Sequence, residues 1–359
     1  MSRRRFTLLL LTSTSVTMAA SCAPTVVLPP GMAANPAAIG GTPPAAVTDK
    51  VATRPVVAKP TTSPPPFPQL VAHRGGTKDK PENTLVAIES ALANHADMIW
   101  LTVQLSADGV PVLYRPTDLA SLTDGKGPVA GMTFARLQSL NAGWTFTDSA
   151  AGQPAVYPYR AHPVRMPSLR QALHHIPATV PVVLDMKALP AEAQAEAVAK
   201  VLQEEGAWGR VLIYSTEAAY QRAFSQYPKA RVFESRDATR KRLVDVSLGG
   251  RCDAPGNGTW AGFELRRNVI VSETFTLGKA ETPAVAALWN PRSVACYRSR
   301  NAVNLVAFGV NDEAAYCEAM RLGLDAVMVD SPARMSAIRA RLQASPAPCA
   351  PTMPSAPDK

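Results

Sequence analysis

A histidine, an arginine and a carboxylate stand close together in the stretch VAHRGGTKDKPENTLVAIESAL of this 359-residue chain. His73 and Arg74 end a short apolar run, and Glu82 lies just before a predicted helix at residues 84–94. Histidine transfers protons near neutral pH, arginine binds oxyanions, and a carboxylate binds cations. A histidine at a strand end is often only a hydrogen-bonded surface residue, so this group needs support from the rest of the chain.

Short apolar, β-branched runs alternate with amphipathic stretches, which predicts parallel βα units. We expect a (β/α)8 TIM barrel, because eight strand candidates within about 275 residues match the size of that fold. An open doubly wound sheet is the alternative, but no glycine-rich dinucleotide motif follows the first candidate. The expected strands are residues 70–72, 98–103, 111–114, 181–186, 211–214, 231–233, 304–309 and 326–329.

The amino-terminal part has the composition of a targeting segment followed by a tether. SRRRF has the form of a twin-arginine signal, and AASC resembles a lipoprotein box with Cys22 as the lipidated residue. An ordinary signal peptide with an incidental cysteine is the alternative. The Pro/Ala/Thr-rich part that follows has few charges and no sustained period, so it is expected to be disordered. The predicted parts are the signal at 1–22, the linker at 23–68, the barrel at 69–343 with an insertion at about 237–301, and a disordered tail at 344–359.

The formal net charge of +9 limits the kinds of partner. The arginines are scattered, with no aromatic interleaving and no nucleic-acid module, which argues against DNA or RNA. A basic surface suits anionic lipid headgroups or an acidic substrate. We therefore expect an exported protein on the periplasmic side of a bacterial cell envelope, held to the membrane by a lipid anchor.

The cysteines suit an oxidising compartment. If Cys22 is lipidated, an even number remains, and Cys252 and Cys296 flank one irregular segment. A bridge between these two is expected, with buried free thiols as the alternative.

Together with the spaced PENT, the first motif resembles the opening of the glycerophosphodiester phosphodiesterase (GDPD) family, a group of phospholipase-C-like TIM barrels. The resemblance continues through ADGVPVLY, LTDGKGPVAGMTFARLQSLNAG, MPSLRQAL, VVLDMK and VAFGVNDEAAYCEAMRLGLDAVMVDSP. It covers nearly all of residues 70–343 apart from the insertion. It implies hydrolysis of glycerophosphodiesters with a divalent cation, and two histidines as general base and general acid.

The resemblance assigns roles to positions at the barrel mouth, the end where the carboxyl ends of the strands meet. His73 matches the first catalytic histidine, and Arg74 a neighbouring phosphate contact. Glu82 matches the acidic residue of the second motif. Lys187 and Phe308 match two further residues of the substrate pocket.

The stretch MIWLTVQLSADGVPVLYRPTDL departs from the family. The family's second strand ends in Glu-Leu-Asp, both acids binding metal, where this chain has Trp100 and Thr102. Its second histidine is replaced by Arg115. Glu82 and Asp185 remain as an incomplete site, so we expect no cofactor or a weakly bound Mg²⁺ or Ca²⁺.

These replacements also change the expected electrostatics and shape of the mouth. Arg74, Arg115 and Lys187 outnumber the two remaining carboxylates, which predicts a net cationic mouth that binds a phosphodiester or lipid headgroup. Trp100 is expected either as a flat wall against the ligand or as core that fills the vacated space.

Three hypotheses about activity follow. The first is binding of a phosphodiester without turnover. The second is metal-independent hydrolysis, similar to bacterial phosphatidylinositol-specific phospholipases, with His73 as base, Arg115 in place of the metal charge and the loop residue His162 as acid. The third is ordinary metal-dependent hydrolysis with nearby ligands among Asp97, Asp108 and Asp118, although Asp108 is expected in a turn at the bottom of the barrel.

Overall fold

The computed structural model describes residues 67–148 and 153–349, which lie in the compact unit Thr61–Lys359. The expected export signal, Cys22, and most of the tether and tail lie outside the described residues. Within the described part of the chain, no helix has the length and apolarity needed to cross a bilayer.

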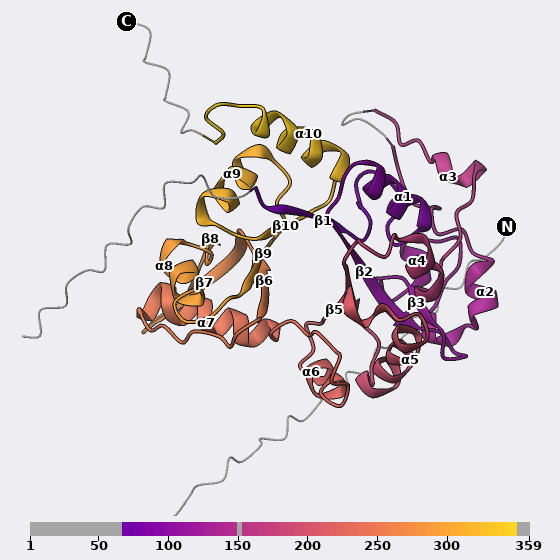
Figure 1. The fold of residues 1–359 in the computed structure, drawn as a ribbon, viewed down its shortest axis with the longest axis horizontal. Coiled ribbons are helices and arrows are strands. Elements are labelled where there is room, and N and C mark those ends of the chain that lie inside the picture. Colours follow the sequence, from indigo (N-terminus) through magenta and orange to yellow (C-terminus); the bar gives the residue numbers. More distant parts are fainter. Residues whose placement is uncertain (1–66, 149–152, 350–359) are drawn as a thin grey trace, which may run out of the picture. The chain divides into compact units, whose positions relative to one another are not determined.

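Seven parallel strands form most of a barrel, in the order β5-β4-β2-β1-β10-β9-β6 (Figure 1). Residues 231–234 close the remaining gap. Ile213 on β5 pairs with Arg231 and Phe233, and the Glu234 N–H donates to the Trp260 carbonyl on β6 at 2.8 Å. The expected (β/α)8 barrel is therefore confirmed. The strands are β1 (Gln69–His73), β2 (Met98–Leu105), β4 (Val182–Met186), β5 (Val211–Tyr214), β6 (Trp260–Glu264), β9 (Asn304–Phe308) and β10 (Ala326–Val329).

One expected barrel strand is wrong, and one barrel strand is absent from the prediction. The strand β3 (Pro111–Leu113) pairs antiparallel with β2, with Val103 opposite Leu113, and is not a barrel strand. The missing barrel strand is β6, which lies within the segment interpreted as an insertion. The insertion is therefore shorter than expected. It consists of the antiparallel hairpin formed by β7 (Arg267–Phe275) and β8 (Gly278–Ala286).

Helices follow the barrel strands, and polar caps fix where several begin. Ser168 and Asn290 each form a capping box, while Thr84, Asp312 and Ser331 accept from the first turn of their helices. The α-helices are α1 (Leu85–Ala93), α2 (Phe134–Gln138), α3 (Pro158–Ala161), α4 (Leu169–His175), α5 (Ala191–Glu204), α6 (Ala219–Phe224), α7 (Arg236–Gly249), α8 (Pro291–Tyr297), α9 (Glu313–Leu322) and α10 (Pro332–Gln343). Short 3-10 turns lie at η1 (Leu119–Ser121), η2 (Val129–Gly131) and η3 (Ala207–Gly209).

The barrel interior is filled by a buried aromatic cluster. Trp100 contacts Tyr214, Phe233 and Phe308, with ring centroids 4.9, 6.0 and 5.4 Å away. Gly262 on β6 makes room for this cluster, since a Cβ there would lie 2.3 Å from the Phe308 ring. The mouth residues above therefore rest on a solid floor and not on an open channel.

Two disulfides fasten the second half of the barrel. The bridge Cys252–Cys296 is the pair expected from the sequence, and it joins the segment after α7 to α8. A second bridge, Cys317–Cys349, joins α9 to the segment that follows α10.

Candidate functional site

His73 at the end of β1 faces Asp330, the residue that follows β10. Its Nδ1 lies 2.8 Å from Asp330 Oδ1, and Asn311 donates to the other carboxylate oxygen at 2.8 Å. The hydrogen bond from His73 lowers the pKa of Asp330 to about 2, so the carboxylate is ionised at neutral pH. An ionised partner on Nδ1 places the proton there and leaves Nε2 as the proton acceptor.

Arg74 and Glu82 form a partly buried ion pair beside this histidine. The Arg74 Nη1 donates to Glu82 Oε2 at 2.5 Å. Arg74 and Asn83 both adopt left-handed backbone angles, with φ of 52° and 57°, and the Asn83 N–H donates to the Arg74 carbonyl. Non-glycine residues in this region are strained, and such strain concentrates at functional sites.

Asp185 on β4 is the most buried carboxylate of the mouth. Its Oδ1 lies 3.0 Å from Lys187 Nζ, and the Thr102 hydroxyl donates to Oδ2 at 3.4 Å. Burial raises the pKa of Asp185, while the ammonium group of Lys187 opposes that shift. Thr102 is fixed in turn, because its N–H donates to Asn83 Oδ1 at 2.9 Å.

Buried polar atoms without a hydrogen-bond partner gather at this wall. Within the described part of the chain they are Arg74 Nε, Glu82 Oε1, Asn83 Nδ2 and Asp185 Oδ1. The last of these is close to Lys187 but out of line for a hydrogen bond. Buried polar groups almost always have hydrogen-bond partners in proteins. Donors and acceptors that lack a partner at one place therefore suit a polar ligand.

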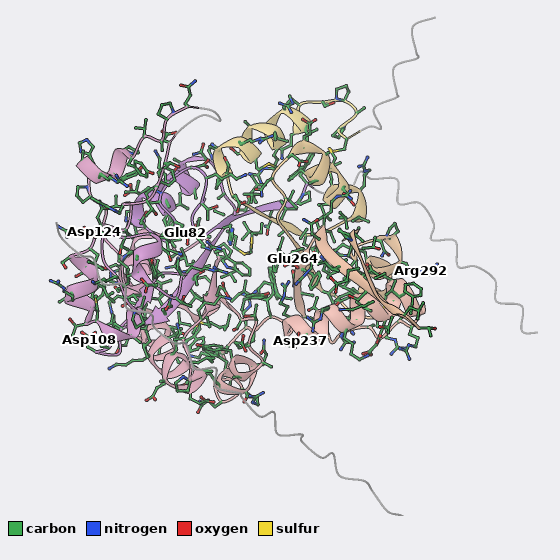
Figure 2. The ribbon with its side chains drawn as sticks, turned by 180° about the vertical axis from the view of Figure 1, so that it is seen from behind. Glu82, Asp108, Asp124, Asp237, Glu264 and Arg292 are labelled. Atoms are coloured by element: carbon green, nitrogen blue, oxygen red, sulfur yellow. A yellow bond between two sulfur atoms is a disulfide. The ribbon has the colours of Figure 1, made fainter. Side chains whose placement is uncertain are left out.

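A second charged group lies on the opposite wall and was missed from the sequence. Arg236, at the start of α7, donates to both Glu264 oxygens at 2.5 and 2.7 Å, and to the Tyr214 hydroxyl at 3.4 Å. Figure 2 labels Glu82 and Glu264, which come from these two walls. Glu264 ends β6, so the signal was hidden when that strand was assigned to an insertion.

Trp100 and Phe308 do not form a wall of the mouth. Trp100 is only 2% exposed, and Phe308 is 8% exposed within the same aromatic cluster. Trp100 is therefore core that fills the interior, the second of its two expected roles. The interpretation of Phe308 as a direct ligand contact finds no support in its position below the polar residues.

Arg115 and His162 are exposed residues on the long connection after β2. Neither side chain makes a hydrogen bond or ion pair with a residue in the described ranges, and Arg115 follows β3, which pairs with the end of β2 and is not one of the parallel barrel strands. The structure therefore does not join either side chain to His73. The catalytic roles that sequence assigns to them remain predictions.

The alternative metal ligands have structural roles instead. Asp97 accepts from Leu70 N–H, and Asp118 caps η1. Asp108 accepts from Ser106 and from Phe134 N–H, in a hairpin turn beyond the carboxyl end of β2. Its expected place at the bottom of the barrel is wrong, because β2 continues past the mouth before the chain turns.

The donor set of the mouth does not fit a divalent cation. Within the described ranges, no three His, Cys, Asp or Glu side chains are grouped as metal ligands would be. Glu82 and Asp185 are each held by a cationic side chain, which would repel a metal ion. A hard cation needs several oxygen ligands to replace its hydration, and these two carboxylates do not supply them.

Charged groups of both signs line the mouth. The cations Arg74, Lys187, Arg236 and Arg267 stand beside the carboxylates of Glu82, Asp185, Glu264 and Asp330. Glu264, Asp330, Arg236 and Arg267 are not among the residues expected in the mouth from the sequence, and its net cationic charge stays a prediction.

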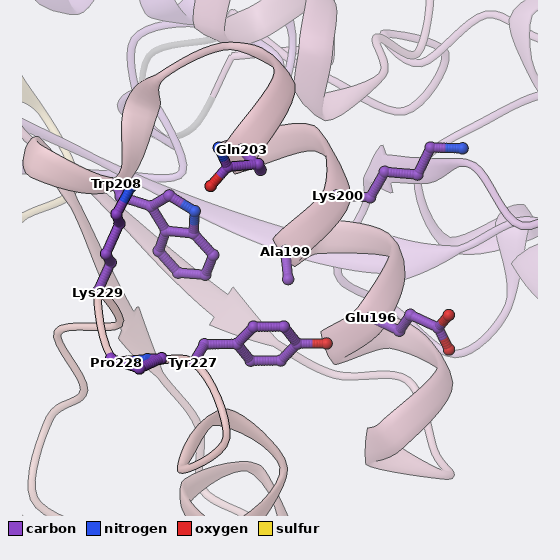
Figure 3. Close-up of a pocket in the computed structure, with 8 residues that line it drawn as sticks. All are labelled: Glu196, Ala199, Lys200, Gln203, Trp208, Tyr227, Pro228 and Lys229. Atoms are coloured by element: carbon purple, nitrogen blue, oxygen red, sulfur yellow. The ribbon is translucent and has the colours of Figure 1, made fainter.

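Two cavities have volumes suited to a small molecule, and one of them reaches the mouth. A cavity of about 340 Å³ reaches Glu82 and is lined by Thr77, Lys78, Thr145 and Phe146 among others. A more apolar cavity of about 480 Å³ lies on the outer face of α5, between Trp208 and Tyr227 (Figure 3). Only the first contains a residue of the mouth, and it has the size of a small-molecule site.

Comparison with known proteins identifies the family. Residues 73–334 match the model of the glycerophosphoryl diester phosphodiesterase family. The Mycobacterium tuberculosis protein Rv2277c is 48% identical over 268 residues, which cover 74% of this chain and 87% of that protein. The crystal structure of its glycerophosphoryl diester phosphodiesterase domain is 46% identical and has a TM-score of 0.71, covering 76% of this chain and 100% of that one.

A more distant structure shares the fold. An Oleispira antarctica phosphodiesterase in complex with the product sn-glycerol-3-phosphate is 20% identical, with a TM-score of 0.55. The match covers 76% of this chain and 97% of that chain. The family model spans most of the barrel and the mycobacterial relative matches nearly throughout, so this chain belongs to the glycerophosphoryl diester phosphodiesterase family.

Proposed function

We propose that this chain binds a glycerophosphodiester or a related lipid headgroup at the barrel mouth, and that it does so without a divalent metal. The observation that carries this proposal is the set of three buried atoms without a partner among the described residues, Arg74 Nε, Glu82 Oε1 and Asn83 Nδ2, beside the Asp185–Lys187 ion pair. They lie within the residues that the family model matches, next to Thr102, which stands where the family resemblance places a metal-binding carboxylate.

The buried atoms without a partner suit both parts of such a ligand, the phosphate and the glycerol. Arg74 Nε and Asn83 Nδ2 are donors, which suit phosphate oxygens. Glu82 Oε1 is an acceptor, which suits a hydroxyl group of a glycerol moiety. Binding would satisfy polar groups that are costly to leave buried and unpaired.

A second candidate function is metal-independent hydrolysis of the same ligand. The pairing of His73 with Asp330 favours it, because an imidazole held by an ionised carboxylate is suited to accept a proton from a nucleophile. Lys187 and Arg74 would supply positive charge as the phosphate charge builds. Arg115 and His162 are the sequence candidates for the further charge and the acid.

One experiment separates these functions from metal-dependent hydrolysis. Purified full-length chain is titrated with sn-glycerol 3-phosphate by calorimetry, and glycerophosphoethanolamine hydrolysis is followed with and without EDTA. Binding without turnover supports the first function. EDTA-insensitive turnover that His73→Ala abolishes supports the second. Turnover that requires added Mg²⁺ or Ca²⁺ contradicts both, and so does a lack of any binding.

We also propose that the chain is exported and lipid-anchored at Cys22, which rests on the signal and lipoprotein box in its sequence. Mass spectrometry of the amino-terminal fragment should then show a diacylated Cys22. Cys22→Ser should move the protein from the membrane fraction to the soluble fraction, and an unmodified cysteine would refute the anchor.

A further inference from the structure

The exposed large apolar side chains of the described residues are concentrated on the β7–β8 hairpin. Five of the eight, Ile270, Val271, Phe275, Leu277 and Val285, lie there, and Leu277 is 99% exposed. Single exposed apolar residues are ordinary, but a cluster marks an interaction surface.

The exposed apolar side chains lie on both faces of the hairpin and at its turn. Val271 and Phe275 share one face, because alternate residues of a strand point to the same side, while Ile270 and Val285 lie on the other. The turn between the strands adds Leu277. The second face also carries Lys279, Glu281 and Ser272, which contact one another.

The hairpin begins at the mouth. It leaves the barrel immediately after Glu264, at the carboxyl end of β6, and Arg267 at its base lies 3.8 Å from the Glu264 carboxylate. A surface that holds the tip of the hairpin would therefore lie within about 30 Å of the end of the barrel where the ligand is proposed to bind.

The small size of each face of the hairpin disfavours a protein partner. Two strands of nine residues measure about 30 Å by 10 Å, or about 300 Å², from ordinary strand dimensions. A stable protein interface buries about 800 Å² on each partner. A lipid surface needs no complementary shape and accepts a small protruding group, with a lysine beside it at the headgroup level.

We propose that the β7–β8 hairpin is a membrane-contacting element that inserts Phe275 and Leu277 into the lipid interface and turns the barrel mouth toward lipid headgroups. The inference rests on the proposed location of the chain at a membrane surface. The chain's net charge of +9 makes an anionic surface the favoured partner. A lipid anchor and a tether would keep the hairpin at high effective concentration near the bilayer, so weak insertion suffices.

The test uses the full-length chain carrying Cys22→Ser, so that no attached lipid contributes to binding. Co-sedimentation with vesicles of equal phosphatidylglycerol and phosphatidylcholine is expected to show partitioning. The added pair Phe275→Ser and Leu277→Ser is expected to weaken it at least tenfold. Leu248→Ser, at an 82% exposed position on α7, is the matched control and should bind as the parent does.

Several outcomes overturn the inference. They are absence of vesicle binding by the parent, equal binding by the Phe275/Leu277 variant, and an equal loss in the Leu248 control. A parent that is dimeric in solution, with the dimer lost in the hairpin variant, would assign the hairpin to a second copy instead. Failure of Cys22 lipidation in the cell refutes the anchor alone, because vesicle binding by the Cys22→Ser chain is measured separately.

Discussion

The charged side chains at the mouth are arranged as pairs before any ligand arrives. Each of these ionisable groups has a partner of opposite charge or a hydrogen-bonding partner, which fixes its orientation. Such fixed dipoles and charges bind an anion without the cost of reorganising. The pairs are His73–Asp330, Arg74–Glu82, Lys187–Asp185 and Arg236–Glu264.

The Asp330 carboxylate should make stability depend on acid pH. Its pKa is lowered to about 2 in the folded chain, so it stabilises the fold above its unfolded pKa of about 4. That contribution, about 2 kcal/mol, is lost as pH falls from about 4 to 2. Urea unfolding at pH 5, 4, 3 and 2 should show a smaller decline for Asp330→Asn than for the parent. Parallel declines would mean that the His73 contact does not hold the carboxylate ionised.

The Arg74–Glu82 pair should behave as a buried ion pair. Glu82→Gln leaves a partly buried guanidinium without its carboxylate, and we expect a loss of about 3 kcal/mol in the free energy of unfolding. The double variant Arg74→Met/Glu82→Gln should lose less than the single one, since no charge is stranded. Denaturant unfolding of Glu82→Gln, Arg74→Met and the double variant measures the coupling, and additive losses would contradict it.

At the scale of elements, close packing between β6 and β9 sets the floor of the mouth. Gly262→Ala puts a methyl group against Phe308 at 2.3 Å, so we expect a loss of about 1–3 kcal/mol from overpacking. Gly262→Ala combined with Phe308→Leu should recover part of it, because the smaller side chain vacates that space. Thermal unfolding compares the variants, and Gly209→Ala, where a Cβ meets nothing within 4 Å, is the control.

The strands that could be predicted from sequence are those with continuous apolar runs. VVLDM and VLIY are buried throughout, and a barrel strand covered on both faces needs such a run. PVLY has the same composition but pairs antiparallel, because the Asp-Gly turn folds it back on β2 before it can enter the barrel. β6, WAGFE, does not show such a run. Glu264 ends it, and Gly262 stands in its middle, where packing against Phe308 leaves no room for a side chain.

Site residues in local motifs can be predicted from the sequence, and those defined by long-range contacts cannot. His73, Arg74 and Glu82 lie in motifs that carry the family resemblance, and the structure brings them together. Asp330 was available from its place just after a predicted strand, yet its contact with His73 joins residues 257 positions apart. No local pattern encodes such a contact, since it depends on β1 and β10 being neighbours when the barrel closes.

At the scale of the whole molecule, both disulfides lie in the half of the barrel that follows β5. They fasten the connections around α7, α8, α9 and α10, while the half that carries His73, Asp185 and Lys187 has none. The hydrophobic core of that first half is continuous from β1 to α6. Cross-links are therefore concentrated where the chain leaves the regular βα pattern and carries the exposed hairpin.

Loop-closure entropy predicts what each bridge contributes. The bridges span 44 and 32 residues, and closing loops of these lengths removes about 4 kcal/mol of unfolded-chain entropy each, with a difference between them of about 0.3 kcal/mol. Cys252→Ser/Cys296→Ser and Cys317→Ser/Cys349→Ser should therefore lower the free energy of unfolding by similar amounts in urea titrations. Because none of the four cysteines contributes a side chain to the mouth, affinity for sn-glycerol 3-phosphate should stay within about twofold of the parent in either variant. A selective loss of affinity in the Cys252/Cys296 variant would instead show that the α7–α8 half shapes the mouth through Arg236 and Glu264.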